Sequence, residues 1–325
     1  MNHKLYPLAA LSLCACAAIP IAASSQTFPV KPVRVISTFA PGSVADLSIR
    51  QLAQKMTESI GQPVVVDVRM GGGGVVGAEA TAHSAPDGYT VVVAQPTTIL
   101  VVPLLLKKKP YDPIKSFTPI THAIDGPTCI VVNAAVPVNS VKELIAYIRR
   151  NPGKLAYGHN GIGGTYHLQM EYLRQQLGLD MTPVPYKGGI AALMDAVTGV
   201  VPIAFSAAGS ALPQVRAGKV KMLAILDTQR YADLPDVPAM SEDLPDFEKL
   251  PTGLSIYGPA AMPNAVVQRL YAEIAKGLKA PDVQAKLKEF AFYAVGSAPA
   301  QFAARQERDL ENFAKAVKAA GLKPE

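Results

Sequence analysis

The chain has 325 residues and a formal net charge of +6, from 31 basic and 25 acidic side chains. This excess is small and dispersed, and the single basic run, three lysines at 107–109, is typical of a solvated loop. The sequence has no tryptophan and only 6% aromatic residues that could stack on bases, so it argues against a nucleic-acid partner.

The amino terminus has the pattern of a secretory signal. Lys4 precedes an apolar stretch over residues 5–23, which contains two prolines and ends in small polar residues. We therefore expect residues 1–25 to be a cleaved signal peptide and the mature chain to be exported. The expected cleavage site lies near Ala23, Ser24 or Ser25.

A lipoprotein signal, with Cys16 as the lipidated residue, is the minor alternative. After cleavage Cys129 is the cysteine that remains, so we expect an exported protein that is stabilised by an ordinary core without an intramolecular disulfide. The remaining length of about 300 residues allows two domains.

Short β-branched runs alternate with longer segments of helical period, which predicts an α/β fold throughout. Strands are expected at residues 32–38, 63–68, 89–95, 129–133, 155–158, 182–186, 201–206, 220–226 and 253–258. Helices are expected at residues 44–60, 76–84, 264–280 and 299–320, after the capping residue Ser140, and from about Thr165, Gly189 and Ser210. The proline-rich segment 228–251 is expected to be an irregular surface connection.

A late strand and two late helices follow the long middle block, which indicates that the chain crosses twice between two domains. We predict that residues 26–125 and 253–325 form the first domain and that residues 126–252 form the second.

The clearest site signal is the loop Phe-Ala-Pro-Gly-Ser-Val-Ala-Asp at residues 39–46, between the first strand and the first helix. Ser43 and Asp46 have the spacing of a capping box. Ligands of open parallel sheets lie beyond the carboxyl ends of the strands, and a helix start offers unpaired N–H groups to an anion. The loop therefore predicts a carboxylate site without a Lys or Arg anchor. The alternative, that Ser43 only caps the helix, stays open.

A similar glycine-rich loop occupies residues 158–164, where Thr165 could cap the next helix. Two such loops from different domains would face one cleft. A plain turn with Asn and Gly in left-handed conformations is the alternative, and His167 is more typical of a packed histidine than of a ligand contact.

The glycine run at residues 72–77 satisfies G-x-G-x-x-G after a strand, so a dinucleotide site has to be considered. That fingerprint needs an acidic residue about 20 positions later, and this sequence has Gln95 there. The histidines have no metal-ligand spacing, no nucleophile elbow is present, and Cys129 lies in an apolar strand. We therefore predict no catalytic residues, no metal and no cofactor.

Several collinear segments resemble one family. They are Phe-Pro-Val-Lys-Pro-Val-Arg at 28–34, Phe-Ala-Pro-Gly at 39–42, Gly-Gln-Pro-Val-Val-Val at 61–66, Ala-Pro-Asp-Gly-Tyr-Thr at 85–90, Pro-Tyr-Asp-Pro at 110–113, Asn-Pro-Gly-Lys-Leu-Ala-Tyr-Gly at 151–158, Val-Pro-Tyr-Lys-Gly at 184–188 and Leu-Pro-Asp-Val-Pro at 234–238. In these the chain is similar to the TctC-like substrate-binding proteins of tripartite tricarboxylate transporters, the Bug receptors.

This resemblance implies a periplasmic binding protein-like fold, with two α/β domains that close on a ligand like a Venus flytrap. It also implies a periplasmic, non-enzymatic receptor that captures a small organic carboxylate and delivers it to membrane permease subunits, and that works as a monomer. The site residues that it implies are Pro41, Gly42, Ser43, Val44, Asp46, Gln95, Thr97, Thr98, His159, Asn160, Gly163, Gly164, Thr165, Tyr186, Ser206 and Ala207.

Two departures from the family pattern bear on the ligand. Family loops commonly read Pro-Gly-Gly-Gly-Thr-Asp, whereas Ser-Val-Ala follows Pro-Gly here. Many members have Phe-Asp where this chain has Phe205 and Ser206, and the lost carboxylate is the natural partner of an amino group. Our hypothesis is a non-amino ligand, either an aromatic carboxylate or a dicarboxylate, with its apolar body near Val44 and Ile162.

Two other functions stay open at this point. A carboxylate-sensing receptor would present its loaded form to a signalling system in place of a permease. An exported dinucleotide-dependent oxidoreductase would use the glycine run at residues 72–77.

Overall fold

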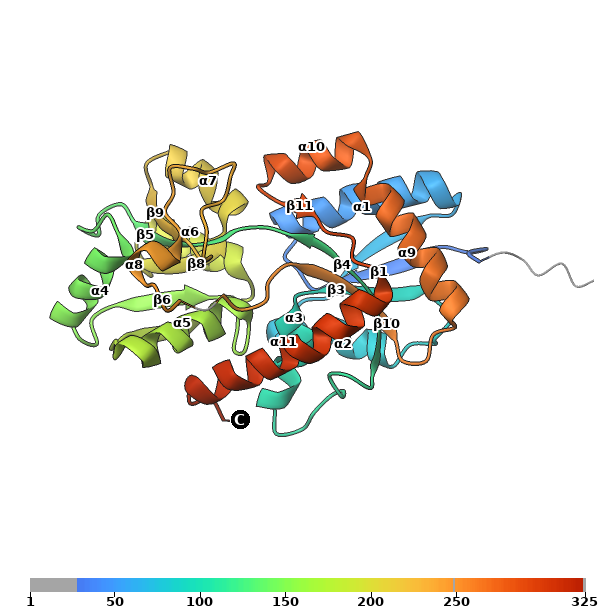
Figure 1. Cartoon of the computed structure of the whole chain (residues 1–325), viewed down its shortest axis with the longest axis horizontal. Helices are drawn as coiled ribbons and strands as arrows, with labels where there is room; N and C mark the ends of the chain where they lie inside the picture. Colours follow the sequence, from blue (N-terminus) through green and yellow to red (C-terminus); the bar gives the residue numbers. More distant parts are fainter. Residues whose placement is uncertain (1–27, 248, 324–325) are drawn as a thin grey trace, which may run out of the picture.

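Residues 28–247 and 249–323 are described by the structure, which is a computed structural model. They form two lobes, each with its own β-sheet between layers of helices (Figure 1). The expected signal peptide, its cleavage site and Cys16 lie outside the described residues. Within the described part of the chain, no helix is long and apolar enough to cross a membrane.

The first lobe contains a six-stranded sheet of order β11-β4-β10-β3-β1-β2. Its strands are β1 (Val33–Ser37), β2 (Val64–Val68), β3 (Thr90–Ala94), β4 (Phe117–Asp125), β10 (Leu254–Pro259) and β11 (Tyr293–Ala294). Strand β1 is parallel to β2 and β3, whereas β10 runs antiparallel to both β3 and β4.

Helices cover both faces of this sheet. They are α1 (Val44–Ile60), α2 (Val75–Ala82), α3 (Pro96–Leu100), α9 (Asn264–Leu278), α10 (Pro281–Glu289) and α11 (Pro299–Ala319), with the 3-10 turns η1 (Gly72–Gly74) and η2 (Val102–Leu105). Successive side chains of β1 point to opposite faces of the sheet, and both faces are covered by helices. Val35 packs with α1, α9 and α10 on one face, while Ile36 packs with α2, α3 and α11 on the other.

The second lobe contains a five-stranded sheet of order β7-β6-β8-β5-β9. Its strands are β5 (Thr128–Asn133), β6 (Ala156–His159), β7 (Thr182–Pro185), β8 (Ile203–Ala207) and β9 (Val220–Ile225). Its helices are α4 (Val141–Arg150), α5 (Thr165–Leu177), α6 (Gly189–Thr198), α7 (Ala208–Arg216) and α8 (Met240–Asp243). The α/β alternation expected from the sequence is thus confirmed in both lobes.

The chain passes between the lobes after β4 and returns before β10 (Figure 1). All strands of the first sheet lie within residues 33–125 and 254–294, and those of the second lie within 128–225. We therefore propose domain boundaries near residues 125 and 253. The carboxyl-terminal helix α11 also extends from the first lobe to contact α5 of the second.

Helix α1 shows how the sequence sets an element that carries site residues. The Ser43 Oγ accepts a 3.2 Å hydrogen bond from the Asp46 N–H, and the helix ends at Gly61, whose φ of 74° suits glycine. One apolar face of this helix, which includes Ile49 and Met56, is buried against the sheet.

Other elements differ from the sequence-based expectation. Strand β4 was not predicted, because the buried polar residues Thr121 and His122 interrupt its apolar pattern. Helix α10 was also missed, and the short helix α8 lies inside the segment expected to be irregular. Thr165 is not the cap of α5, since Gly164 occupies that position and has no side chain to accept a bond.

Candidate ligand-binding site

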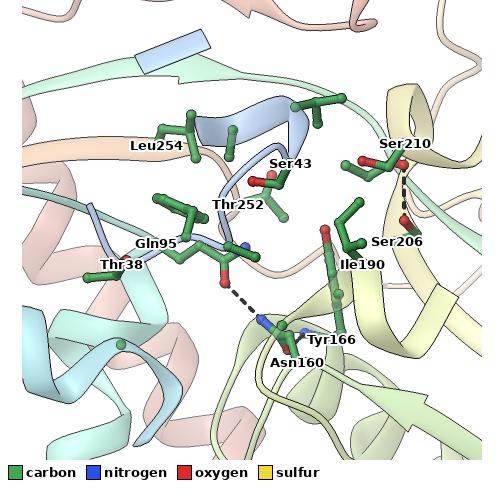
Figure 2. Close-up of a pocket in the computed structure, with 18 of the residues that line it drawn as sticks. Thr38, Ser43, Gln95, Asn160, Tyr166, Ile190, Ser206, Ser210, Thr252 and Leu254 are labelled. Carbon is green, nitrogen blue, oxygen red and sulfur yellow. Dashed lines mark hydrogen bonds between the residues drawn. The ribbon is translucent and has the colours of Figure 1, made fainter. Parts of the chain in front are cut away.

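A cavity of about 110 Å³ lies between the two lobes (Figure 2). Its lining comes from the loops that follow β1 and β3 in the first lobe and β6 and β8 in the second, together with the segments that connect the lobes. These are the carboxyl ends of parallel strands, where open α/β sheets place their ligands. The cleft expected between two glycine-rich loops is therefore present.

The start of α1 supplies main-chain donors to this cavity. Ser43, Val44 and Ala45 all line it. The N–H groups of Val44 and Ala45 lie in the first turn of the helix, so helix geometry leaves them without an intrahelical acceptor. Together with the positive end of the helix dipole, they form a place for a negatively charged group.

Asp46 holds this loop in place and does not line the cavity. Its Oδ2 accepts a 3.0 Å bond from the Gly42 N–H and another of 3.0 Å from Arg50 Nε. Gly42 has a φ of 76°, which glycine adopts without strain, and its N–H is thereby occupied. The expected site residues Pro41, Gly42 and Asp46 therefore shape the loop from outside the cavity lining.

Two side-chain hydrogen bonds join the lobes across the cleft. Asn160 Nδ2 donates to Gln95 Oε1 at 2.9 Å, while Asn160 Oδ1 accepts from the Tyr166 N–H at 3.2 Å (Figure 2). Deeper in, the hydroxyls of Thr97 and Thr165 share a bond of 2.9 Å, and both residues are buried outside the cavity lining. These bonds tie the two lobes together on either side of the cleft.

A pair of stacked histidines supports the loop between β6 and α5 from behind. The rings of His159 and His167 stack with centroids 4.2 Å apart. The His159 Nδ1 bonds the Gly161 carbonyl at 3.1 Å, and the Gly163 N–H donates to His167 Nδ1 at 3.0 Å. Burial, and next the proximity of His167, lower the pKa of His159 to about 4. His159, Gly163 and Gly164 lie outside the cavity lining.

Of the sixteen residues expected at the site, seven line the cavity. These are Ser43, Val44, Gln95, Thr98, Asn160, Ser206 and Ala207. Tyr186 lies outside this lining, and its hydroxyl donates to Asp195 Oδ2 at 2.6 Å.

The resemblance also implies Lys187 and Gly188, and both line the cavity at the start of α6. Further lining residues were missing from the expected set, with Gly189 and Ile190 at the same helix start and Ser210 in the first turn of α7. The signal for both was in the sequence, because each group follows a predicted strand in the same way as the two loops that were chosen. Three helix starts thus face the cavity.

Asp125, which also lines the cavity, was missed because no motif marks it. Its Oδ1 accepts from the Gly126 N–H at 2.8 Å and from the Thr252 hydroxyl at 2.9 Å, and its Oδ2 lies 3.4 Å from His122 Nε2. Burial by itself raises the pKa of Asp125, but the hydrogen bond with His122 and the charges of His122 and Lys249 outweigh burial and hold it below its ordinary value. This carboxylate joins the two segments that connect the lobes.

Residues 48–322 match the family described as "Tripartite tricarboxylate transporter family receptor". The chain belongs to this receptor family. The protein BugT of Bordetella pertussis is 33% identical over 316 residues, covering 95% of this chain and 95% of BugT. A UPF0065 protein of the same organism is 35% identical over 278 residues, which cover 85% of this chain and 86% of that protein.

Solved structures of similar sequence share the two-lobed fold of the receptor. The periplasmic binding protein BugD has a TM-score of 0.85 at 29% identity, covering 92% of this chain and 100% of BugD. An R. palustris protein solved with adipate has a TM-score of 0.86 at 28% identity, and the match covers 92% of this chain and 100% of that protein. MatC of Rhodopseudomonas palustris, solved with malate, has a TM-score of 0.83 at 29% identity, and the match covers 89% of this chain and 100% of MatC.

Family membership and fold confirm that the chain is a solute-binding receptor of the Bug type with the periplasmic binding protein architecture. They do not favour the dinucleotide-dependent or the signalling alternative. The glycine run forms the turn η1 and the start of α2, and Gly71, Gly73 and Gly74 line the cleft between the lobes.

Proposed function

We propose that this receptor captures a small organic carboxylate in the interlobe cavity by closure of the lobes, and delivers it in the periplasm to the permease subunits of a tripartite tricarboxylate-type transporter. The observation that carries the proposal is the convergence of the starts of α1, α6 and α7 on one cavity between the lobes. Two related proteins of the same fold were solved with the dicarboxylates adipate and malate.

The polar groups of the cavity suit a carboxylate. The side chains of Ser43, Asn160 and Ser210 supply hydroxyl and amide donors beside the N–H groups in the first turn of α1. No arginine is found among the described residues that line the cavity. The ligand charge is thus balanced by main-chain and neutral donors, with Lys187 as the one cation of this lining.

The same lining disfavours an amino-acid ligand. Its single carboxylate belongs to Asp125, whose oxygens are already occupied by Gly126, Thr252 and His122. Ser206, where many family members have Asp, bonds the Ala207 carbonyl at 3.2 Å. A ligand ammonium group would therefore be desolvated without a free anionic partner, which is costly. We propose a non-amino carboxylate.

Capture and release need no chemical step. The nucleophiles and bases of the site are already engaged in positioning, since Asp125 bridges the connecting segments and His159 supports a loop. Burial raises the pKa of the Cys129 thiol far above its ordinary value, so this residue is not a reactive thiolate. We propose a monomeric receptor that binds its ligand without transforming it.

Thermal-shift screening followed by isothermal titration tests this proposal. The panel contains benzoate, malate, adipate and citrate, with glutamate and aspartate as amino-acid counterparts. A ligand that binds only the folded receptor raises the melting temperature, and we expect this for at least one of the non-amino carboxylates. Tight binding restricted to the two amino acids would contradict the proposed ligand class, and absence of binding to all six would contradict carboxylate capture.

A further inference from the structure

A second cavity, of about 360 Å³, lies in the seam between the lobes beside the first. Apolar side chains come from both lobes, with Val102, Leu105 and Leu106 on one side and Ile162 and Pro185 on the other. Most of its remaining lining is glycine main chain. The second cavity thus offers an apolar surface, and both lobes are needed to form it.

The two cavities share part of their walls. Gly71, Gly73 and Lys187 line both of them. The two glycines have φ values of 124° and 67°, a conformation that side chains rarely adopt, so the shared wall consists of main chain and one flexible lysine. At the same place the lobes touch, because a Cβ on Gly161 would lie 3.6 Å from the Gly73 nitrogen.

Ile162 is an exposed apolar residue in the lining of the second cavity. It lies on the loop between β6 and α5, and 49% of its surface is exposed. The sequence-based hypothesis places one apolar body of the ligand near Val44 and Ile162, but Val44 lines the first cavity and Ile162 the second. A ligand that touches both residues has to extend through the shared wall region beside Lys187.

We propose that the two cavities form one extended site for a carboxylate with an apolar tail, an inference that rests on the proposed function. The carboxylate is held by the helix starts of the first cavity, and the alkyl or aryl tail covers the apolar walls of the second. Lys187 lies at the junction, where its carbon chain packs on the tail while its ammonium group stays in water.

The dependence of affinity on chain length tests this inference. Isothermal titration of the mature receptor with straight-chain carboxylates from butanoate to decanoate should show affinity rising about fourfold per methylene once the chain enters the second cavity. Butanoate binding without any gain for longer chains would overturn the inference and leave the proposed function intact. Failure of the whole series and of the carboxylate panel would overturn both.

A matched pair of variants locates the tail. Ile162→Asn should lower decanoate affinity roughly tenfold and leave butanoate affinity unchanged, because it removes apolar contact only in the second cavity. Val200→Asn is the control, since Val200 is an exposed residue of the same lobe that lines neither cavity. Equal losses for both ligands in Ile162→Asn, or the same losses in Val200→Asn, would contradict the assignment.

Competition provides an independent check. Butanoate should displace decanoate, because both carboxylates need the same helix starts. Simultaneous binding of the two ligands would make the second cavity a separate site and would overturn the inference.

Discussion

The buried His159 behind the cleft predicts that the stability of the receptor depends on pH. His159 is 1% exposed, and its ring stacks on His167 while its Nδ1 bonds the Gly161 carbonyl. With a pKa of about 4 in the folded state, this ring is neutral at physiological pH. In an unfolded chain, in contrast, the histidine ring is protonated near its ordinary pKa of 6.5.

The sign of the resulting pH dependence follows from proton uptake. Because the unfolded state binds the proton first, stability is complete above about pH 6.5 and is lost as the pH falls toward about 4, by up to about 3 kcal/mol. His159→Asn keeps a donor for the Gly161 carbonyl but does not titrate. We therefore expect the free-energy difference between wild type and variant, measured by urea unfolding, to shrink on acidification.

The exposed His83 is the control for this measurement, because its Nδ1 also bonds a carbonyl, that of Glu79, at 2.9 Å. Its ring is exposed, so His83→Asn serves as the matched substitution at a surface position. Parallel curves for wild type and His159→Asn would contradict the role given to His159.

Helix starts are the elements on which the site is built. The start of α1 at the site and the start of α4 away from it are capped in the same way, since Ser43 accepts from the Asp46 N–H at 3.2 Å and Ser140 accepts from the Glu143 N–H at 3.1 Å. Ser43 lines the cavity, whereas Ser140 does not. Substitution of each serine therefore distinguishes the effect of a helix cap on stability from its effect on ligand affinity.

We expect Ser43→Ala and Ser140→Ala each to lower the free energy of unfolding by about 1 kcal/mol, because each removes one helix cap. Only Ser43→Ala should also weaken carboxylate binding, measured by titration calorimetry with the tightest ligand of the panel. Equal affinities in the two variants would show that the start of α1 takes no part in binding.

At the scale of the whole molecule, function depends on how closely the lobes approach. Gly209 of α7 faces the end of α10 in the other lobe, and a Cβ added to it would lie 1.8 Å from the Phe290 carbonyl oxygen. On the same side of the cleft, Tyr231 stacks on Tyr293, and Lys288 lies 3.7 Å from Asp233. These contacts form only when the lobes are closed as they are here.

Gly209→Ala should hold the lobes apart without unfolding either one. Alanine suits a helix interior better than glycine, so the melting temperature without ligand should not fall. Ligand affinity should fall roughly ten- to hundredfold, as expected for a steric conflict of about 1–3 kcal/mol in the closed form. Wild-type affinity, together with unchanged compaction on ligand addition in small-angle scattering, would contradict this view of closure.

Local sequence determined much of the fold and part of the site. Apolar periodicity located most strands and helices, and the cap at Ser43 with Gly61 at the other end defined α1. The loops after β1, β3, β6 and β8 were recognisable because strand ends and glycine-rich turns are written in consecutive residues. Strand β4 was not predicted from the sequence, because its buried polar residues find their hydrogen-bond partners only in the folded protein.

Only the tertiary structure decided which of these loop residues line the cavity. The bonds between Asn160 and Gln95 and between Thr97 and Thr165 join residues more than 60 positions apart, so no local pattern contains them. The same holds for Asp125 at the lobe connection and for the placement of Val44 and Ile162 in different cavities. The position of a helix start is determined by neighbouring residues in the sequence. The shape of the cleft, in contrast, depends on how the two lobes pack, and that packing rests on contacts between residues distant in sequence.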